Sequence, residues 1–297
     1  MGAEPVPSGL CVVDKPSGLT SHDVVARIRR LAKTRRVGHA GTLDPMATGV
    51  LVLGIERATK LLGLLALTDK TYDATIRLGE STVTDDAEGA VTATASADGV
   101  TEQGISKALR DFVGEIDQVP SSVSAIKVDG RRSYARVRAG EHVELAARRV
   151  SIRRLDVLDV RRERPGCLDV DVSLDCSTGT YVRAIARDLG TALGVGGHLT
   201  RLRRTRVGPF DISAALTLER LAEAASAVTI ELSAAVAASF PRRDVDDADA
   251  VKLAHGRSLA LAGLAGTYGV FAPDGTAIAL VEERDGVARP VVVLRPA

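Results

Sequence analysis

The 297-residue chain has few aromatic side chains, with four Phe, four Tyr and no Trp, about 3% in all. This scarcity excludes a nucleic-acid surface built on many stacked rings, so base recognition would depend on single rings and arginine planes. The chain also lacks an excess of charge, because 39 Lys and Arg nearly balance 38 Asp and Glu. The whole-chain charge therefore does not indicate a polyanionic partner.

Cysteine is equally scarce: Cys11, Cys167 and Cys176 form an odd set without the spacing of metal ligands. No segment approaches the roughly 20 apolar residues of a membrane span, and no apolar run of the signal-peptide type begins the chain. We therefore expect a reduced, cytoplasmic protein without a bound metal or a membrane contact. With 45% hydrophobic residues, the chain is long enough for a substantial core.

Charged residues are nevertheless unevenly distributed along the chain. Basic residues gather at 131–164 and 201–206, and acidic residues at 84–88 and 244–249. Such clustering predicts one electropositive face, although a solvated surface with no partner is the common alternative.

Hydrophobic periodicity predicts a mixture of strands and helices. Leu10–Val13 is a short apolar strand, and the helix that follows is expected to begin with Thr20 and Asp23 as a capping box. Residues 70–78 and 168–176 alternate between apolar and polar side chains, which is typical of half-buried strands. Ser177-Thr178-Gly179 is predicted to open another helix that Gly190 ends.

The remaining segments indicate an insertion and a second domain. Residues 121–149 are polar, arginine-rich and weakly periodic, as expected of an excursion from the core. An alanine-rich helical region is predicted around 218–238, and short β segments separated by turns follow it. We expect an α+β fold with a mixed, mostly antiparallel sheet flanked by helices, in a domain at 1–238 and a small β domain at 239–297.

The densest group of chemically informative residues lies around Asp44, where glycines 38, 41 and 49 allow close approach of a ligand. By itself, Asp44-Pro45 is also how many helices begin, with the carboxylate as the N-cap and the proline in the first turn.

Together with four further segments, this block resembles the TruB-type family of tRNA pseudouridine-55 synthases along most of the chain. The similar segments, in order, are Asp14-Lys15-Pro16, Gly38-His39 through Leu43-Asp44-Pro45, Lys70-Thr71-Tyr72 with Thr84-Asp85-Asp86, Cys176 through Arg183, and Gly197-His198-Leu199 with Leu202-Arg203-Arg204-Thr205. The resemblance implies the pseudouridine synthase fold, a PUA-like C-terminal domain that binds RNA, and uridine isomerisation in the tRNA T-loop without a cofactor. No obligate protein partner is evident.

In this reading Asp44 is the catalytic carboxylate. It could attack the sugar carbon or C6 of the base, or remove a proton from C2′, and the residues leave all three routes open. In each route the carboxylate starts ionised, and a guanidinium fork such as that of Arg183 favours the charged form. The family implies that these two residues pair.

The resemblance also implies a set of substrate contacts. Tyr72 would stack on the target uracil and assist the late proton removal from C5, although an ordinary core tyrosine is the alternative. Tyr181 and Leu202 would line the same pocket, and His39 would fill the space left by the flipped base.

Residues 121–149 match the thumb loop of the family, which clamps the RNA stem-loop. Ser121 and Val123 depart from the proline and tyrosine that relatives usually have there. Phosphate contacts by several basic residues of this loop predict a steep fall of affinity with salt. The expected RNA-binding residues are Lys15, Lys127, Arg131, Arg132 and Arg204, with Arg136 and Arg138 as further phosphate contacts.

Three alternatives remain on the sequence. A guide-RNA-dependent synthase shares the fold but lacks the long thumb loop and carries basic tails. A non-catalytic RNA-binding or folding factor would explain the basic clusters without requiring Asp44, Tyr72 and Arg183 together. A nucleoside glycosylase that pairs Asp44 with Asp85 or Asp86 predicts the release of free uracil.

Overall fold

The computed structural model describes residues 6–121, 127–128, 131–132 and 145–297, with 127–128 and 131–132 described by their backbone alone. The chain divides into two compact units. Unit 1 comprises Met1–Asp44, Gly49–Ala66 and Val207–Ala297, and unit 2 comprises Pro45–Thr48 and Leu67–Arg206. Among the described residues, no helix has both the length and the apolar composition needed to cross a membrane.

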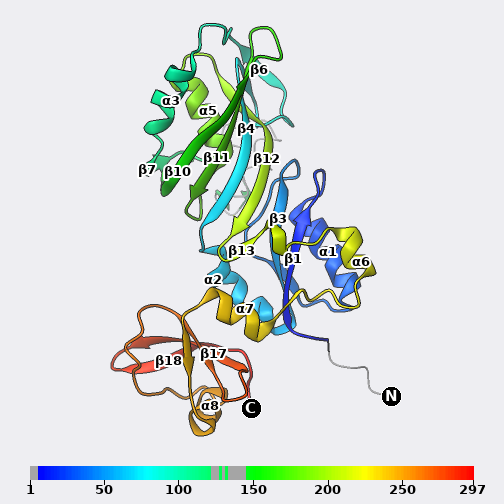
Figure 1. Ribbon diagram of the computed structural model, residues 1–297, viewed down its shortest axis with the longest axis vertical. Helices are drawn as coiled ribbons and strands as arrows, with labels where there is room; N and C mark the ends of the chain where they lie inside the picture. Colours follow the sequence, from blue (N-terminus) through cyan, green and yellow to red (C-terminus); the bar gives the residue numbers. More distant parts are fainter. Residues whose placement is uncertain (1–5, 122–126, 129–130, 133–144) are drawn as a thin grey trace. The chain divides into compact units, whose positions relative to one another are not determined.

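In unit 1, strand β1 (Gly9–Lys15) pairs antiparallel with β3 (Thr48–Ile55) on one side and β14 (Ile230–Glu231) on the other. Strand β2 (Val37–His39) also pairs with β3, and helix α1 (Ser21–Leu31) contacts β2 (Figure 1). The other helical segments of this part are η1 (Glu56–Leu61), α2 (Leu62–Ala66), η2 (Ile212–Ala214), α6 (Leu218–Glu223) and α7 (Leu232–Ser239).

The predicted start of α1 is confirmed. Thr20 accepts a hydrogen bond from the backbone of Asp23 at 3.1 Å, and the Asp23 carboxylate accepts one from the Thr20 backbone at 2.9 Å. Both bonds satisfy N–H groups that a helix start leaves without partners. The buried face of the helix, with Val24, Val25 and Ile28, follows the helical spacing of the sequence.

The C-terminal part of unit 1 is a small β domain, as predicted. Its four strands lie in the order β15 (Arg242–Asp244), β16 (Tyr268–Phe271), β17 (Ala277–Arg284) and β18 (Val287–Val293), beside α8 (Asp247–Ala254). Buried side chains of α8 and the strands form a separate core that includes Leu253, Tyr268 and Val281. The boundary expected at residue 239 stays a prediction.

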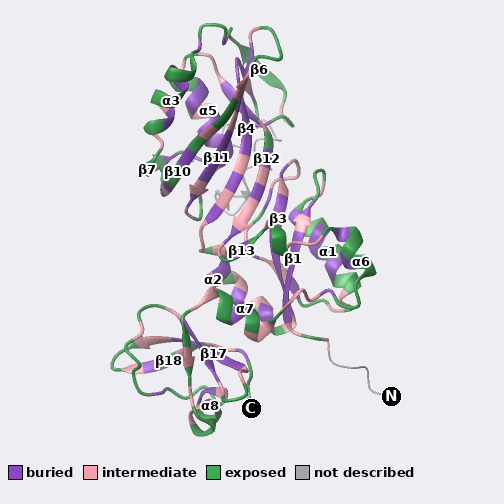
Figure 2. Cartoon of the chain, viewed as in Figure 1, coloured by how far each residue is buried: buried purple, intermediate pink, exposed green. Residues whose placement is uncertain are grey.

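Unit 2 is built on five strands in the order β12-β4-β11-β10-β7. Their bounds are β12 (Gly197–Val207), β4 (Lys70–Leu78), β11 (Leu168–Cys176), β10 (Arg148–Arg161) and β7 (Gly114–Gln118). The three pairs from β4 to β7 are antiparallel, and the central strands β4 and β11 are largely buried (Figure 2). Helix α5 (Val182–Ala192) contacts β4, and α3 (Glu102–Arg110) contacts α5 and β10.

Smaller elements complete unit 2: the pair β5 (Glu80–Thr82) and β6 (Val91–Thr94), and the short pair β8 (Lys127–Val128) and β9 (Arg131–Arg132). The α+β class with mostly antiparallel strands is therefore confirmed, as are the strands predicted at 70–78 and 168–176.

Two predicted helix details are wrong. Ser177 does not cap α5, because its hydroxyl accepts the Ser151 backbone N–H at 2.9 Å and the helix begins five residues later. Gly190 does not end α5 either: a Cβ there would lie 2.1 Å from the Gly196 backbone, so close packing requires this glycine. The helical region predicted around 218–238 contains two helices, α6 and α7, with β14 between them.

Candidate active site

Asp44 lies in the loop that joins β2 to β3. The described residues 40–47 contain no helical turn, so the reading of Asp44-Pro45 as a helix start is wrong. The preceding residue, Leu43, is held by the buried Ser21 hydroxyl, which accepts the Leu43 N–H at 2.9 Å and donates to the Leu43 carbonyl at 3.1 Å. The loop beside the half-buried Asp44 is thereby fixed to the first residue of α1.

Ser21 was not among the residues predicted to shape the site. Its signal was weak, because a serine in a first helical turn ordinarily contributes to capping or faces solvent.

His39 ends β2 in the same unit and is half-buried. Its ring meets that of His22 edge to face, with centroids 5.6 Å apart and planes at 84°. No metal-ligand geometry is involved in this contact, which is an aromatic one.

Lys15 was expected to bind RNA, and this stays a prediction. The side chain is fully buried, and its ammonium donates to the carbonyls of Pro16 at 2.9 Å and Leu19 at 2.7 Å. A buried ammonium needs such partners to offset lost hydration, so these two bonds tie Lys15 to the turn after β1.

Arg183 lies in the first turn of α5 and is buried. One guanidinium nitrogen, Nη1, donates to the carbonyl of Thr84 at 3.0 Å and lies 3.3 Å from a carboxylate oxygen of Asp86. The other oxygen of Asp86 accepts the Glu88 N–H at 3.0 Å and the hydroxyl of Thr84. Arg183 and Asp86 therefore form a buried, hydrogen-bonded ion pair within unit 2.

This role of Asp86 was missed, although the Thr84-Asp85-Asp86 motif had been noted. Asp44 belongs to unit 1 and Arg183 to unit 2, and their expected pairing stays a prediction.

Three more site residues belong to unit 2. Tyr72 on β4 is 8% exposed and lies opposite Leu174 of β11. Tyr181 precedes α5 and is half-buried, and Leu202 on β12 is buried. Burial of the tyrosine ring fits both a core residue and the wall of a base pocket, so its role stays a prediction.

Arg204 was also expected to bind RNA, and this stays a prediction; its side chain is 1% exposed. It lies near the buried Lys70, whose pKa is lowered to about 8 by burial and by the charge of Arg204. Both cations are buried within unit 2.

The expected thumb-loop contacts are only partly described. Lys127 pairs with Arg132 across β8 and β9, and Arg131 pairs with Val128, as backbone partners. Their side chains, and the whole of Arg136 and Arg138, lie outside the described residues.

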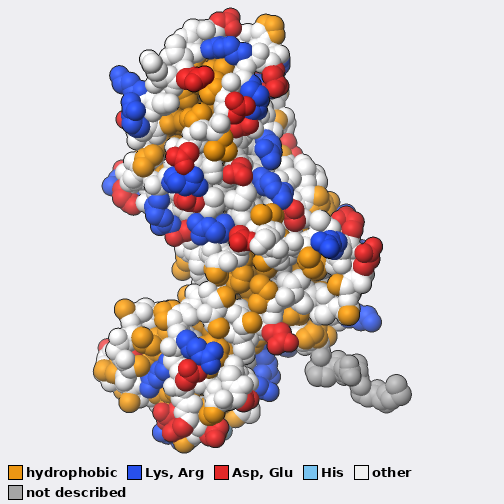
Figure 3. Space-filling view, viewed as in Figure 1, with side chains coloured by type: hydrophobic (Ala, Val, Ile, Leu, Met, Phe, Trp, Pro, Cys, Tyr) orange, Lys and Arg blue, Asp and Glu red, His pale blue; other side chains and the backbone are white. Residues whose placement is uncertain are grey.

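Acidic neighbours offset part of the charge of the basic run at 148–164. Over unit 2, basic and acidic side chains are interspersed on the face seen in Figure 3. Ion pairs of this run include Arg149–Asp117, Arg153–Asp69, Arg154–Asp175, Arg161–Asp171 and Arg164–Glu80. Each of these arginines has an acidic neighbour, and the electropositive face stays a prediction.

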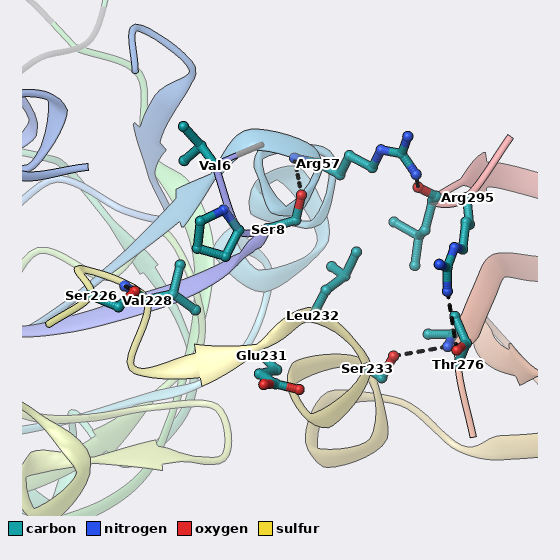
Figure 4. A pocket seen from close by; sticks show the side chains of 13 residues that line it. Val6, Ser8, Arg57, Ser226, Val228, Glu231, Leu232, Ser233, Thr276 and Arg295 are labelled. Atoms are coloured by element: carbon teal, nitrogen blue, oxygen red, sulfur yellow. Dashed lines mark hydrogen bonds between the residues drawn. The ribbon is translucent and has the colours of Figure 1, made fainter. Parts of the chain in front are cut away.

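An open cleft of about 720 Å³ lies in unit 1, between the η1–α7 region and the start of β17 (Figure 4). Arg57 donates to the Leu294 carbonyl at 3.4 Å on one wall, and Arg295 donates to Thr276 at 3.2 Å on another. None of the predicted site residues lines this cleft.

Comparison with known proteins identifies the family of this site. The family model for the N-terminal domain of TruB family pseudouridylate synthases matches residues 29–182. The chain belongs to the TruB family. Two further models match the rest: the C-terminal domain of tRNA pseudouridylate synthase B at residues 183–236, and the C-terminal domain of tRNA pseudouridine synthase II at 240–295.

Full-length relatives of this TruB-family chain carry the name tRNA pseudouridine synthase B. The protein from Mycobacterium sp. (strain KMS) is 58% identical over 297 residues, covering 100% of this chain and 99% of the relative. Those from Mycobacteroides abscessus and Rhodococcus jostii are each 59% identical, covering 98% of this chain and 97% and 95% of the relatives.

Solved structures with the same fold include a Cbf5–Nop10–Gar1 complex, with a TM-score of 0.75 and 25% identity over 98% of this chain and 86% of that chain. An H/ACA RNP bound to a substrate RNA containing 2′-deoxyuridine is similar at a TM-score of 0.72 and 23% identity, over 99% of this chain and 92% of that chain. These likenesses confirm the expected pseudouridine synthase fold.

Proposed function

We propose that this TruB-family protein converts uridine 55 in the T-loop of tRNA to pseudouridine, with the carboxylate of Asp44 acting on a flipped-out uridine. The observation that carries the proposal is the match over nearly the whole chain, at 57–59% identity, to proteins named tRNA pseudouridine synthase B. Family and relatives together make the chain an isomerase that acts on tRNA. The carboxylate and the position in the T-loop are the finer part of the proposal.

The reaction breaks the bond between N1 of the base and C1′ of the ribose, turns the base, and joins C5 to C1′. The proton on C5 then leaves and N1 gains one, so the product is an isomer of the substrate. An ionised carboxylate can act on C1′, on C6 or on the C2′ proton without any cofactor. The Ser21 bonds to Leu43 support this role, because they hold the neighbouring backbone of Asp44 in place.

Arg183 is proposed to keep Asp44 ionised. A guanidinium has five N–H donors in a fixed plane, so an arginine anchored by one carboxylate can bind a second. The buried pair with Asp86 supports this role, since it fixes the orientation of the fork inside unit 2. A closed pocket that excludes water would protect the separated base from hydrolysis.

The substrate contacts follow the same proposal. Tyr72 stacks on the uracil and assists removal of the C5 proton, Tyr181 and Leu202 line the pocket, and His39 fills the space that the flipped base leaves. Lys127, Arg131 and Arg132 contact the T stem-loop. The domain at 239–297 adds a PUA-like RNA contact to the catalytic domain at 1–238, in a cytoplasmic enzyme that needs no protein partner.

The purified chain, given unmodified tRNA and no guide RNA, tests the proposal. We expect pseudouridine at position 55 alone, read by chemical modification and primer extension, and loss of about 10³-fold or more in rate for Asp44→Asn, since the amide is neither base nor nucleophile. Asp111→Asn, which changes an exposed carboxylate of unit 2, is the matched control and should keep full activity.

Other outcomes separate the alternatives. Free uracil would indicate a glycosylase, activity only with added guide RNA would indicate a guided enzyme, and tRNA binding without product would indicate a binding or folding factor. Full activity of Asp44→Asn would overturn the role of this carboxylate.

A further inference from the structure

The start of α5 lacks the usual capping side chain, although it carries Arg183. Helices favour Ser, Thr, Asp or Asn at the N-cap, because a short side chain can accept an N–H of the first turn. Here Tyr181 holds the N-cap position, and within the described structure its own side chain makes no such bond. The helix start must therefore be fixed from outside.

Gln118, the last residue of β7, provides this support. Its amide nitrogen donates to the Tyr181 carbonyl at 3.1 Å, and its amide oxygen accepts the Tyr181 N–H at 2.8 Å. The orientation of the amide is unambiguous, because a backbone N–H can only donate and a carbonyl can only accept. Gln118 is 3% exposed, so the loss of either bond leaves a buried polar atom of this side chain unsatisfied.

The same carbonyl also belongs to the first turn of the helix. The Tyr181 oxygen accepts the N–H groups of Ala184 at 3.1 Å and Ile185 at 3.3 Å. Gln118 therefore holds a peptide that the helix itself uses to begin, two residues before Arg183.

A second contact ties α5 to the residue after β7. One turn beyond Arg183, the Arg187 guanidinium donates to the Val119 carbonyl at 2.8 Å. Consecutive residues 118 and 119 thus hold α5 at two successive turns, which restricts both its rotation and its position along its axis.

We propose that Gln118 is a positioning residue for the isomerisation, which holds the backbone of Tyr181 and so aims the Tyr181 ring and the Arg183 fork. This inference rests on the proposed function, in which Tyr181 lines the uridine pocket and Arg183 holds the catalytic carboxylate. Because the N-cap side chain is used for the pocket, a residue of another strand holds the N-cap backbone. A purely structural Gln118 would stabilise the fold without changing the rate of a folded molecule.

Two variants separate these roles. Gln118→Leu removes both hydrogen bonds at similar volume. Gln118→Glu keeps the acceptor for the Tyr181 N–H but, when ionised, places a negative oxygen against the Tyr181 carbonyl. Burial raises the pKa of a carboxyl group, so this side chain is protonated at the lower end of the pH range. The protonated form donates to the Tyr181 carbonyl and restores both bonds. The chain has one other glutamine, the exposed Gln103, and Gln103→Glu is the matched control.

The experiment measures kcat and KM with tRNA from pH 6 to pH 8.5, per folded molecule as counted by circular dichroism and active-site titration. We expect Gln118→Leu to lose about 10- to 100-fold in kcat at every pH, as misplaced groups do, with KM within about twofold. Gln118→Glu should show a similar loss at pH 8.5 and recover most of it by pH 6, while Gln103→Glu follows the wild type. Hydrogen exchange at the Tyr181 amide should accelerate in the same variants and under the same conditions.

The proposal is overturned if kcat per folded molecule stays within twofold of wild type in both variants while only the melting temperature falls. If Gln118→Leu does not fold, the recovery of kcat in Gln118→Glu at low pH alone decides between a positioning role and a purely structural role. Failure of the proposed function would look different, because the wild-type chain itself would then make no pseudouridine.

Discussion

Unit 2 uses the same pair of groups, arginine and aspartate, in two contrasting places. Arg183 of α5 and Asp86 form an ion pair whose side chains are 6% and 3% exposed. On the opposite face of β11, aspartates alternate with buried residues and pair with arginines of β4 and β10. These ion pairs are called the β11 ladder. Arg161 and Asp171 there are 31% and 24% exposed, and Arg154 and Asp175 are 42% and 24% exposed.

The difference in burial decides what each set can do. An exposed pair contributes about 0–1 kcal/mol, because water screens the charges and two long side chains lose freedom. A buried pair adds little as a whole, yet removing one partner costs about 3–5 kcal/mol because the other charge remains buried. The ladder on β11 therefore covers an open sheet face, while the buried pair fixes a guanidinium in one orientation.

The largest expected effect concerns activity. Arg183→Lys keeps the charge but loses the planar fork, so we expect a fall of about 100-fold or more in single-turnover pseudouridine formation. Arg161→Lys, the same change on the exposed ladder, should alter the rate less than about twofold. Near wild-type turnover of Arg183→Lys would refute its proposed pairing with a catalytic carboxylate.

A smaller effect concerns stability at neutral pH. Asp86→Asn leaves a buried guanidinium with weaker compensation and should lower the free energy of unfolding by about 3 kcal/mol. Asp171→Asn should lower it by less than about 1 kcal/mol. Urea denaturation of both variants measures the contrast, and equal losses would show that burial does not separate the two regions.

The smallest effect is a pH dependence confined to the ladder. The hydrogen bond from Arg161 holds the pKa of Asp171 below its usual value, with a further contribution from Thr75. A lowered carboxyl pKa adds stability above the unfolded value of about 3.9, and this is lost as pH falls through the folded value.

The difference in unfolding free energy between wild type and Asp171→Asn should therefore shrink between pH 5 and pH 2. It should also shrink at 1 M salt, where screening is strong. A difference that stays constant with pH would contradict the conclusion that the hydrogen bond from Arg161 lowers the pKa of Asp171.

Local patterns in the sequence were reliable where the cause was local. The capping box of Thr20 and Asp23 and the strands at 70–78 and 168–176 depend on residues within one turn or one alternation, and each is present. The burial of Lys15 and Arg204 could not be predicted, for the opposite reason. A charged side chain is ordinarily exposed, and only the surrounding fold brings carbonyls or close packing around it.

By itself, the sequence determined the α+β class, the main strands, the capped start of α1, the small C-terminal β domain and the family to which its motifs point. Only the tertiary structure decided which side chains hold those motifs in place. The hydrogen bond from Gln118 to Tyr181 joins residues 63 apart in sequence, and that from Arg183 to Thr84 joins residues 99 apart. Ser21 is hydrogen-bonded to the backbone of Leu43. Hydrophobic spacing reports which face of an element is buried, but the partner on that face depends on the path of the whole backbone.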